Sequence, residues 1–327
     1  MRVLVTGAYG FLGGYTVAEF LKHDYEVVGF GRNKDKLTEL KKKHKKLEVF
    51  EGDFCDYETV EKATKSIDAV VHCGALSTVW GKRDDFIKTN VDGTVNILRA
   101  CRRNKVKKFV YVSSPSIYAG REDRLMIKED EFDDTNKLNY YIESKILAEK
   151  EIAKFDDVNW TIIRPRGLFG VGDTSIVPRL IKANQKIGIP LFGGGKNYVD
   201  MTCVENVAYA LRLCVESKKD KHKIYNITND EPREFKGILE ELFSQIGIEP
   251  HYRNINLKFA LGAAGAVERF YKLFHIYKEP AITCYTICTL GYSQTMDISK
   301  AKKDLGYKPQ ISLSEEIKKY AKEYNKR

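Results

Sequence analysis

Three glycines near the start of the chain, Gly7, Gly10 and Gly13, constrain its fold more than any other feature. They follow a short run rich in β-branched residues, 2–6, and precede a stretch with helical periodicity, 11–21. The order is therefore strand, glycine turn, helix. In such a unit the first glycine permits the turn, the second lets a ligand approach the backbone, and the third lets the helix pack close to the strand. The free N–H groups at the helix N-terminus favour phosphates, so the turn predicts dinucleotide binding.

Short apolar segments alternate with helical ones as far as residue 165. We expect further strands at 26–31, 47–51, 69–73, 108–113 and 160–164, and long helices at 83–101 and 139–155. This alternation predicts an α/β fold with a Rossmann-type, doubly wound parallel sheet and right-handed crossovers. Ligands of such a fold bind at the carboxyl ends of the strands.

The pattern changes after residue 165, where helical segments dominate and prolines interrupt them. We expect helices at 174–187 and 205–217, strands at 199–204 and 223–228, and a mostly helical remainder. The expected domains are a dinucleotide-binding domain over 1–165, to which 199–228 returns, and a smaller substrate-binding lobe made of 166–198 and 229–327.

Composition narrows the class of protein. The chain has 327 residues, 43% of them hydrophobic, which is enough for a large core. The net charge is +10, but the densest basic run, 41–46, falls at an expected exposed helix end, so we expect no nucleic acid partner. The chain begins directly on a strand, and no apolar stretch reaches the roughly 20 residues of a membrane span. We therefore expect a cytoplasmic protein.

The cysteines and histidines show no metal-ligand spacing. The seven cysteines are scattered, which is typical of a reducing compartment. We expect no bound metal and structural roles for the six histidines. His72, at the end of an expected strand beside the cofactor edge, is expected to pack rather than to catalyse.

The end of the second strand indicates which cofactor is bound. An acidic residue there binds the adenosine ribose and repels a 2′-phosphate. This chain has Gly31 and Arg32 instead, which favours NADP(H), with NAD(H) as the alternative. Asp53, at the end of the third strand, is expected to accept a hydrogen bond from the adenine amino group, with Phe54 beside the ring.

A tyrosine and a lysine four residues apart, Tyr141 and Lys145, lie on one face of the predicted helix 139–155. A phenol has an ordinary pKa of about 10, and a nearby ammonium stabilises the phenolate. Ser114, at the end of the fifth strand, is expected at the same sheet edge, where its hydroxyl can hold a substrate oxygen. Proton transfer beside a hydride carrier predicts carbonyl–alcohol interconversion. Tyr140 remains the alternative for the inward-facing tyrosine.

These motifs resemble the extended short-chain dehydrogenases/reductases of the NAD-dependent epimerase/dehydratase superfamily. Residues 6–13, TGAYGFLG, are similar to the TGxxGxxG turn, and 141–145, YIESK, to the YxxxK motif. Residues 111–118, YVSSPSIY, resemble the strand that carries the catalytic serine. The resemblance covers nearly the whole chain.

The resemblance implies roles for individual residues. Tyr141 is implied as proton donor or acceptor, Lys145 as modifier of its pKa and ribose ligand, and Ser114 as the substrate-orienting hydroxyl, with Ser113 and Ser116 as near alternatives. The full set expected to bind the cofactor is Gly7, Tyr9, Gly10, Phe11, Leu12, Gly13, Arg32, Asp53, Phe54, Gly74, Ala75, Asn90, Tyr141, Lys145 and Pro165.

Three further segments, 79–81, 164–170 and 297–309, resemble the 3β-hydroxysteroid dehydrogenase group, which includes bacterial 2-alkyl-3-oxoalkanoate reductases. This resemblance implies a small apolar substrate, a 3-hydroxy or 3-oxosteroid or a β-keto fatty acyl derivative. The candidate substrate-binding residues are Trp80, Ser116, Arg166 and Leu168.

Two other functions stay open. A nucleotide-sugar epimerase or dehydratase with tightly bound NAD would need a diphosphate clamp, which Arg164, Arg179 and Arg212 could supply. A non-catalytic dinucleotide-sensing regulator would not need the pair of Tyr141 and Lys145.

The lobe and two helices suggest partners. Residues 257–267 and 270–277 are rich in Phe, Leu, Ala and Tyr, which suits the core of the lobe, a pocket for an apolar ligand, or peripheral contact with a membrane. The family resemblance implies a homodimer, formed through the helices expected at 83–101 and 139–155.

Overall fold

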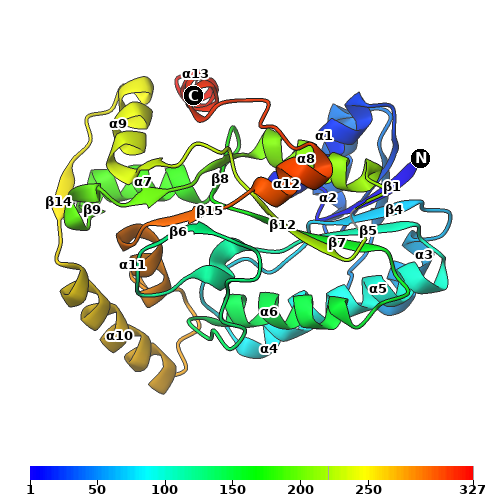
Figure 1. Cartoon of the computed structure of the whole chain (residues 1–327), viewed down its shortest axis with the longest axis horizontal. Helices are drawn as coiled ribbons and strands as arrows, with labels where there is room; N and C mark the ends of the chain where they lie inside the picture. The colour runs from blue at the N-terminus through cyan, green and yellow to red at the C-terminus, as the bar shows by residue number, and fades with distance from the viewer. Residues whose placement is uncertain (220, 327) are drawn as a thin grey trace.

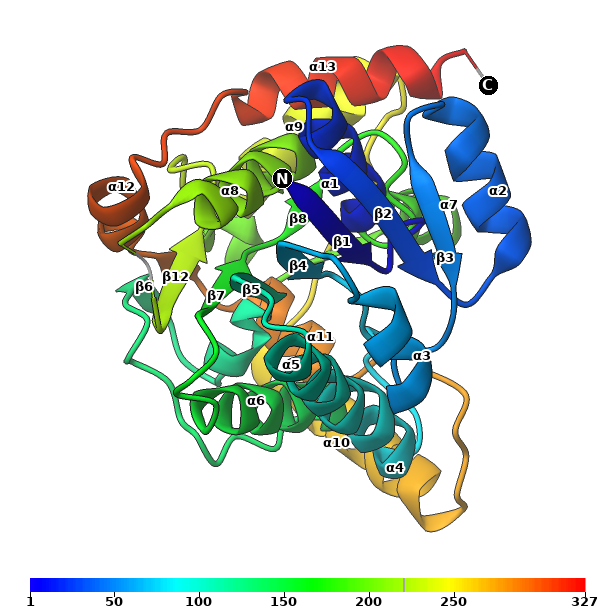
Figure 2. The ribbon, with the colours of Figure 1, turned by 90° about the vertical axis from the view of Figure 1, so that its right-hand side faces the viewer.

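A seven-stranded parallel sheet runs through one half of the computed structural model, which describes residues 1–219 and 221–326. Its strands are β1 (Arg2–Thr6), β2 (Glu26–Gly31), β3 (Glu48–Glu51), β4 (Ala69–His72), β5 (Lys108–Val112), β7 (Trp160–Pro165) and β12 (Lys223–Ile227). The order is β12-β7-β5-β4-β1-β2-β3. Strand order therefore reverses between β1 and β4, where doubly wound folds bind their ligands (Figure 2). The expected Rossmann-type sheet is confirmed.

Helices cover both faces of this sheet because its strands are apolar on both sides. One face packs against α1 (Phe11–Lys22), α2 (Lys34–Lys43), α8 (Val204–Glu216) and α12 (Ser299–Leu305). The opposite face packs against α3 (Tyr57–Ala63), α5 (Gly93–Arg103) and α6 (Tyr140–Ala153). Since α6 and α8 lie on opposite faces, the connection from β7 to β12 has the reverse hand to the crossover from β5 to β7. The expectation of right-handed crossovers is wrong there, because the chain passes through the lobe before it reaches α8.

The helix expected at 83–101 is interrupted in the structure. It consists of α4 (Arg83–Phe86), a π-helical segment η1 (Ile87–Asp92) and α5. Such π-helical turns inside α-helices are frequent at functional sites. Here η1 carries the buried Asn90 toward the loop that follows β4.

The smaller lobe contains more strands than the sequence predicts. Its sheets have the orders β13-β10-β15-β6, β11-β8 and β14-β9. Their strands are β6 (Arg124–Ile127), β8 (Leu168–Phe169), β9 (Ile189–Leu191), β10 (Tyr198–Val199), β11 (Thr202–Cys203), β13 (Arg233–Glu234), β14 (Tyr252–Asn254) and β15 (Gln294–Met296). The single strand expected at 199–204 is thus two short strands in different sheets, and Asp200 between them binds the backbone N–H of Met296.

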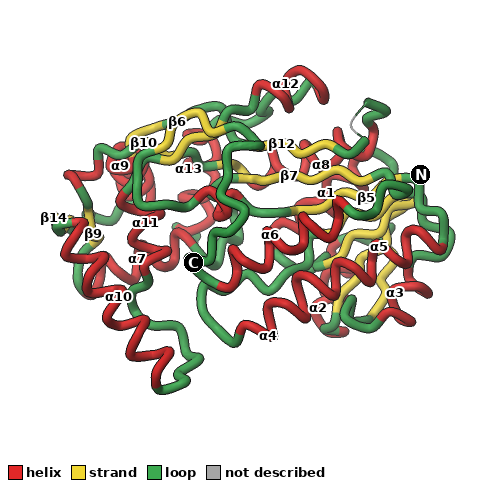
Figure 3. The backbone as a smooth tube through the Cα atoms, turned by 60° about the horizontal axis from the view of Figure 1, so that its bottom comes forward, coloured by secondary structure: helices red, strands yellow, loops and turns green. Residues whose placement is uncertain are grey.

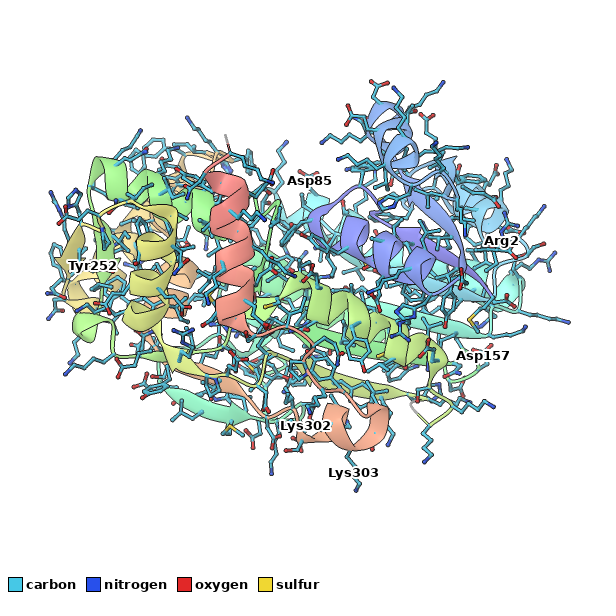
Figure 4. The ribbon with its side chains drawn as sticks, turned by 90° about the horizontal axis from the view of Figure 1, so that it is seen from above. Arg2, Asp85, Asp157, Tyr252, Lys302 and Lys303 are labelled. Carbon is cyan, nitrogen blue, oxygen red and sulfur yellow. The ribbon has the colours of Figure 1, made fainter. Side chains whose placement is uncertain are left out.

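Helices complete the lobe, which lies to one side of the main sheet (Figure 1). They are α7 (Ile176–Lys186), α9 (Phe235–Ile246), α10 (Leu257–Leu273), α11 (Cys284–Gly291) and α13 (Leu313–Tyr324), with short 3-10 turns η2 (Pro115–Tyr118) and η3 (Gly193–Gly195). The molecule is elongated, with Tyr252 near the lobe end and Arg2 at the opposite end (Figure 4). Among the described residues, no helix combines the length and apolarity needed to cross a membrane.

Candidate active site

The glycine turn has the geometry that the sequence predicts. Gly7 has a φ of +64°, and its carbonyl accepts a hydrogen bond from the N–H of Gly10 at 2.8 Å. A Cβ on Gly13 would lie 2.1 Å from the carbonyl oxygen of Gly7, so only glycine allows α1 to pack this close. The N-cap of α1, Gly10, offers no side chain to the helix N-terminus. The first N–H groups of α1 therefore remain available to phosphates, and the turn fits a dinucleotide.

A chain of buried hydrogen bonds fixes the two strands that flank the switch point. The N–H of Gly74 donates to Oγ1 of Thr6 at 3.2 Å, and that hydroxyl lies 2.6 Å from Nδ1 of His72. Nε2 of His72 lies 3.1 Å from Oγ1 of Thr94. Burial lowers the pKa of His72 to about 3, so the ring is neutral. His72 therefore has the structural role that was expected.

Asn90 positions the loop after β4 instead of presenting a free amide. Its Oδ1 accepts from the N–H of Leu76 at 2.8 Å, and its Nδ2 donates to the carbonyl of Leu76 at 3.0 Å and to Ser144 at 2.9 Å. Both ends of the amide are thus occupied. Gly74 and Ala75, which were expected to contact the cofactor, lie in the loop that Asn90 holds.

The residues after β2 and β3 lie together at the expected adenosine end of the site. Nη1 of Arg32 lies 3.5 Å from Oδ2 of Asp53, and both side chains are well exposed. A Cβ on Gly31 would lie only 2.4 Å from the ring of Tyr9, so this ring covers the strand end where an acidic residue would otherwise stand. Phe54 lies in the core, where its ring packs edge to face against His72.

Ser114, at the carboxyl end of β5, lies close enough to Tyr141 to influence the pKa of its phenol. Ser113, the neighbouring candidate, instead donates to the buried carboxylate of Glu149. Desolvation raises the pKa of Tyr141 to about 12, although the hydrogen bond with Ser114 opposes this rise. Ser114 thus lies nearer than Ser113 to the role that was expected, beside Tyr141 of the YxxxK motif, and that role stays a prediction.

Lys145 lies beneath Tyr141 and is wholly surrounded by protein. Its Nζ donates to the carbonyl of Val112 at 2.9 Å and to the hydroxyl of Tyr111 at 3.1 Å, and lies 5.9 Å from the centre of the Tyr141 ring. Desolvation lowers the pKa of Lys145 to about 7. The expected lowering of the Tyr141 pKa is wrong for the protein alone, because desolvation outweighs the other influences on the phenol.

Tyr285 is a site residue that the sequence does not predict. Its hydroxyl lies 2.6 Å from Oγ of Ser116, which accepts a hydrogen bond from Ser114 at 2.9 Å. The lobe helix α11 thereby reaches the pair of Ser114 and Tyr141. A single tyrosine in an apolar helix carries no local signal for this contact, because only the tertiary fold brings α11 to β5.

The three arginines considered for a diphosphate clamp are already paired. Arg164 is bidentate with Glu149, at 3.0 and 2.5 Å, in the interior. Arg179 pairs with Glu279 on the lobe surface, and Arg212 pairs with two carboxylates on α1 and α8. They lie on three different elements, so the structure does not bring them together as a clamp.

The four candidate substrate residues have different surroundings. Ser116 contacts the serine and tyrosine of the site as described. Trp80 donates its indole N–H to the carbonyl of Ile276 at 2.9 Å, which ties the loop after β4 to the segment that follows α10. Leu168, on β8, packs against the core of the main sheet. Arg166 is buried, 6% exposed, and its Nε has no hydrogen-bond partner among the described residues.

Comparisons with known proteins agree with this arrangement. The chain is 31% identical to the 2-alkyl-3-oxoalkanoate reductase of Shewanella oneidensis, with 97% of this chain and 85% of the relative covered. It is 29% identical to the sterol-4-alpha-carboxylate 3-dehydrogenase of Bos taurus, covering 99% of this chain and 92% of the relative. The structure of UDP-glucuronic acid 4-epimerase from Bacillus cereus in complex with NAD has a TM-score of 0.77 and 22% identity, and covers 100% of this chain and 99% of that one.

Most of the chain matches one protein family, the one that the glycine turn and the YxxxK motif indicate. Residues 3–228 match the family described as NAD dependent epimerase/dehydratase, which spans the seven-stranded sheet and the residues around Tyr141. No group of three or more metal-ligating side chains occurs in the described part of the chain. The protein belongs to the NAD dependent epimerase/dehydratase family.

Proposed function

We propose that this protein is an NAD(P)-dependent oxidoreductase that interconverts a ketone and a secondary alcohol on an apolar substrate. The observation that carries the proposal is the grouping of Ser114, Tyr141 and the buried Lys145, whose Nζ lies 5.9 Å from the centre of the Tyr141 ring. This arrangement holds a substrate oxygen and moves a proton to or from it. The glycine turn, which would hold a dinucleotide, lies at the same edge of the sheet.

The names of the relatives suggest the substrate class. A 3-oxoalkanoate carries its ketone two bonds from the carboxylate carbon, and a sterol 4-carboxylate oxidised at carbon 3 has the same relationship. We therefore propose a β-hydroxy or β-oxo acid with a large apolar part, of fatty acyl or sterol type.

Each residue of the site contributes a defined step. The nicotinamide cofactor, when bound, accepts or supplies the hydride. Tyr141 takes the hydroxyl proton in the oxidation and returns it to the carbonyl oxygen in the reduction. Ser114 orients that oxygen, and Lys145 in its protonated form supplies positive charge that stabilises the phenolate of Tyr141 when it forms.

We propose NADP(H) as the preferred cofactor. Arg32 follows β2 directly, its only carboxylate contact within the described residues is with Asp53 at 3.5 Å, and Lys36 lies nearby above the ring of Tyr9. These cations favour a 2′-phosphate. The ring of Tyr9 also disfavours an acidic side chain at position 31.

We further propose that α10 contacts an anionic membrane surface. The helix and the residues after it expose large apolar side chains, Phe259, Phe270, Leu273, Phe274 and Tyr277. Lys258, Arg269 and Lys272 are exposed on the same helix, and the whole chain carries a net charge of +10. The helix extends outward from the lobe (Figure 3). An apolar face flanked by cations suits the interface of an anionic bilayer, from which an apolar substrate can be drawn.

Assembly and compartment complete the proposal. We propose a homodimer in which α5 and α6 of each copy meet, since these helices lie side by side on one face (Figure 2). Light scattering that shows a monomer at micromolar concentration would remove this proposal. The seven cysteines are scattered along the chain, and none of them forms a disulfide within the described residues, which supports the proposal of a reducing compartment, the cytoplasm.

Cofactor turnover with defined substrates tests the function. NADPH and NADH would each be oxidised in the presence of β-oxo esters and 3-oxosteroids, with UDP-glucose as a probe for the nucleotide-sugar alternative. Oxidation of either cofactor that depends on Tyr141 supports the proposal. Tight NAD binding, no turnover on any ketone and epimerisation of the nucleotide sugar would replace it. A Tyr141→Phe variant as active as the parent would contradict the role of this tyrosine.

A further inference from the structure

Arg166 is a buried cation for which the described part of the protein supplies no partner. It is 6% exposed, its Nε is fully buried without a hydrogen bond, and its guanidinium forms no hydrogen bond or ion pair with any described residue. An unpaired buried charge is costly, because nothing replaces the lost hydration. Such a group is therefore a candidate ligand for an anion that binds from outside.

Arg164, two residues earlier, is a buried cation that has a carboxylate partner, as buried charges usually do. Its guanidinium is fully buried and bidentate with the carboxylate of Glu149. Arg166 has no equivalent. Asp200 interacts with it only beyond ion-pair distance, and Oδ2 of Asp200 already accepts from the N–H of Met296 at 2.7 Å.

The backbone holds Arg166 firmly in place at the site. Its N–H donates to the carbonyl of Ile227 at 3.0 Å, and its carbonyl accepts from the hydroxyl of Thr202. Arg166 follows the end of β7, and β7 pairs in parallel with β5, whose end is followed by Ser114, so Arg166 and Ser114 lie at the same edge of the sheet.

We propose that Arg166 binds the carboxylate of the substrate, which rests on the proposed function at the same site. A β-hydroxy acid whose hydroxyl lies between Ser114 and Tyr141 carries its carboxylate two bonds from the reacting carbon. The guanidinium is planar and binds a carboxylate through two parallel hydrogen bonds. Arg166 then selects free acids over esters and fixes which face of the substrate meets the cofactor.

The experiment compares a 2-alkyl-3-hydroxyalkanoate with its methyl ester as substrates for oxidation by NADP⁺ or NAD⁺. The two compounds have the same alcohol and alkyl chain and differ in the charge that Arg166 would bind. The parent, Arg166→Gln, Arg166→Lys and the surface control Arg179→Gln would be assayed. Thermal stabilisation by each compound and by UDP-glucose would be measured as a readout independent of turnover.

We expect the parent to prefer the acid by about 10- to 100-fold in kcat/KM, mostly through KM, which corresponds to a charge-assisted hydrogen bond. Arg166→Gln should lose this preference, because its kcat/KM should fall at least tenfold more on the acid than on the ester, and Arg166→Lys should keep part of it. Arg179→Gln should behave as the parent. Equal losses on acid and ester in Arg166→Gln, or no preference in the parent, would overturn the assignment and leave the proposed function standing.

The binding readout separates the two proposals if neither compound is turned over. Stabilisation by the acid alone, lost in Arg166→Gln, would then support the anion site and refute the oxidoreductase proposal. Stabilisation by UDP-glucose that depends on Arg166 would overturn the carboxylate assignment in favour of a diphosphate. No stabilisation by any compound would overturn both.

Discussion

The hydroxyl of Tyr285 lies 2.6 Å from Oγ of Ser116, although the two residues are 169 positions apart in the chain. This contact extends the row of hydroxyls that begins at Tyr141 and passes through Ser114. The lobe therefore supplies a part of the site that the dinucleotide-binding half lacks.

Tyr285→Phe should lower kcat/KM by about fivefold, because one neutral hydrogen bond contributes about 1 kcal/mol. The loss should appear in kcat, since Ser114 orients the reacting oxygen less well without the hydroxyl of Tyr285 on Ser116. Steady-state kinetics on the parent and the variant measure it. Tyr292→Phe, just beyond α11, is the matched control. A variant with unchanged kcat would show that the lobe hydroxyl does not position the serine.

Tyr141→Phe should reduce kcat by about 10²- to 10⁴-fold, the usual contribution of a positioned proton donor. Cofactor affinity, measured by fluorescence titration, should hardly change, because the ring remains. Tyr140→Phe provides the control on the adjacent residue of α6. If the Tyr140 variant lost the activity instead, the assignment of the two tyrosines would be reversed.

The stability of the protein should depend on pH through Lys145. Its pKa is lowered from 10.5 to about 7 in the folded chain by desolvation. Between these values the unfolded chain binds a proton that the folded chain does not bind, so stability rises with pH from about 7 and reaches its full gain near 10.5. Below about pH 7 both states are protonated and this contribution to the pH dependence ends.

Urea unfolding of the parent and Lys145→Met at pH 7, 8 and 9 isolates this contribution. The stability of the parent relative to the variant should increase with pH, whereas the exposed Lys150→Met, on the same helix, should show no such trend. A difference that is constant over this range would mean that Lys145 keeps its ordinary pKa in the fold.

Arg32→Gln should weaken the preference for NADPH. Loss of one charge-assisted contact to the 2′-phosphate should lower kcat/KM for NADPH by about 10- to 100-fold. The kcat/KM for NADH should be nearly unchanged. Kinetics with both cofactors test this, with Lys43→Gln at the far end of α2 as control. A parent enzyme that already prefers NADH would contradict the cofactor proposal.

The exposed face of α10 should bind vesicles that contain anionic lipid. The parent protein should sediment with phosphatidylglycerol vesicles, and a much smaller fraction of it should sediment with phosphatidylcholine vesicles. The double variant Phe259→Ser, Phe270→Ser should lose binding, since both side chains are exposed and carry the apolar contact. If the parent and the double variant sedimented equally with the anionic vesicles, the binding would be non-specific charge attraction and the apolar contact would be contradicted.

The dinucleotide-binding half is the part that local sequence signals predict well. A strand followed by Gly7, Gly10 and Gly13 predicts the turn between strand and helix directly. The four-residue spacing of Tyr141 and Lys145 places both side chains on one face as soon as this segment is helical. The bounds expected for β2 agree with the structure at both ends. These features depend on residues close in sequence.

Contacts between distant elements were not predictable in this way. The π-helical segment η1 carries Asn90, which binds the loop after β4, and the paired strands of the lobe are only two to four residues long. Tyr285 and the indole of Trp80 act through partners more than 160 residues away. No local pattern marks such residues, since their position follows from tertiary packing.

The core of the dinucleotide-binding half cannot be completed early during synthesis of the chain. Ile298, Ala301 and Tyr307 pack in the same buried cluster as Val3 and Val5, and β12 joins the sheet only after the first part of the lobe has been made. A ribosome releases the glycine turn first, yet the sheet and its covering helices stay incomplete until almost the last residues emerge. The match with the family ends at residue 228. A chain truncated there should therefore expose an apolar surface and aggregate, and should not form a free-standing nucleotide-binding domain.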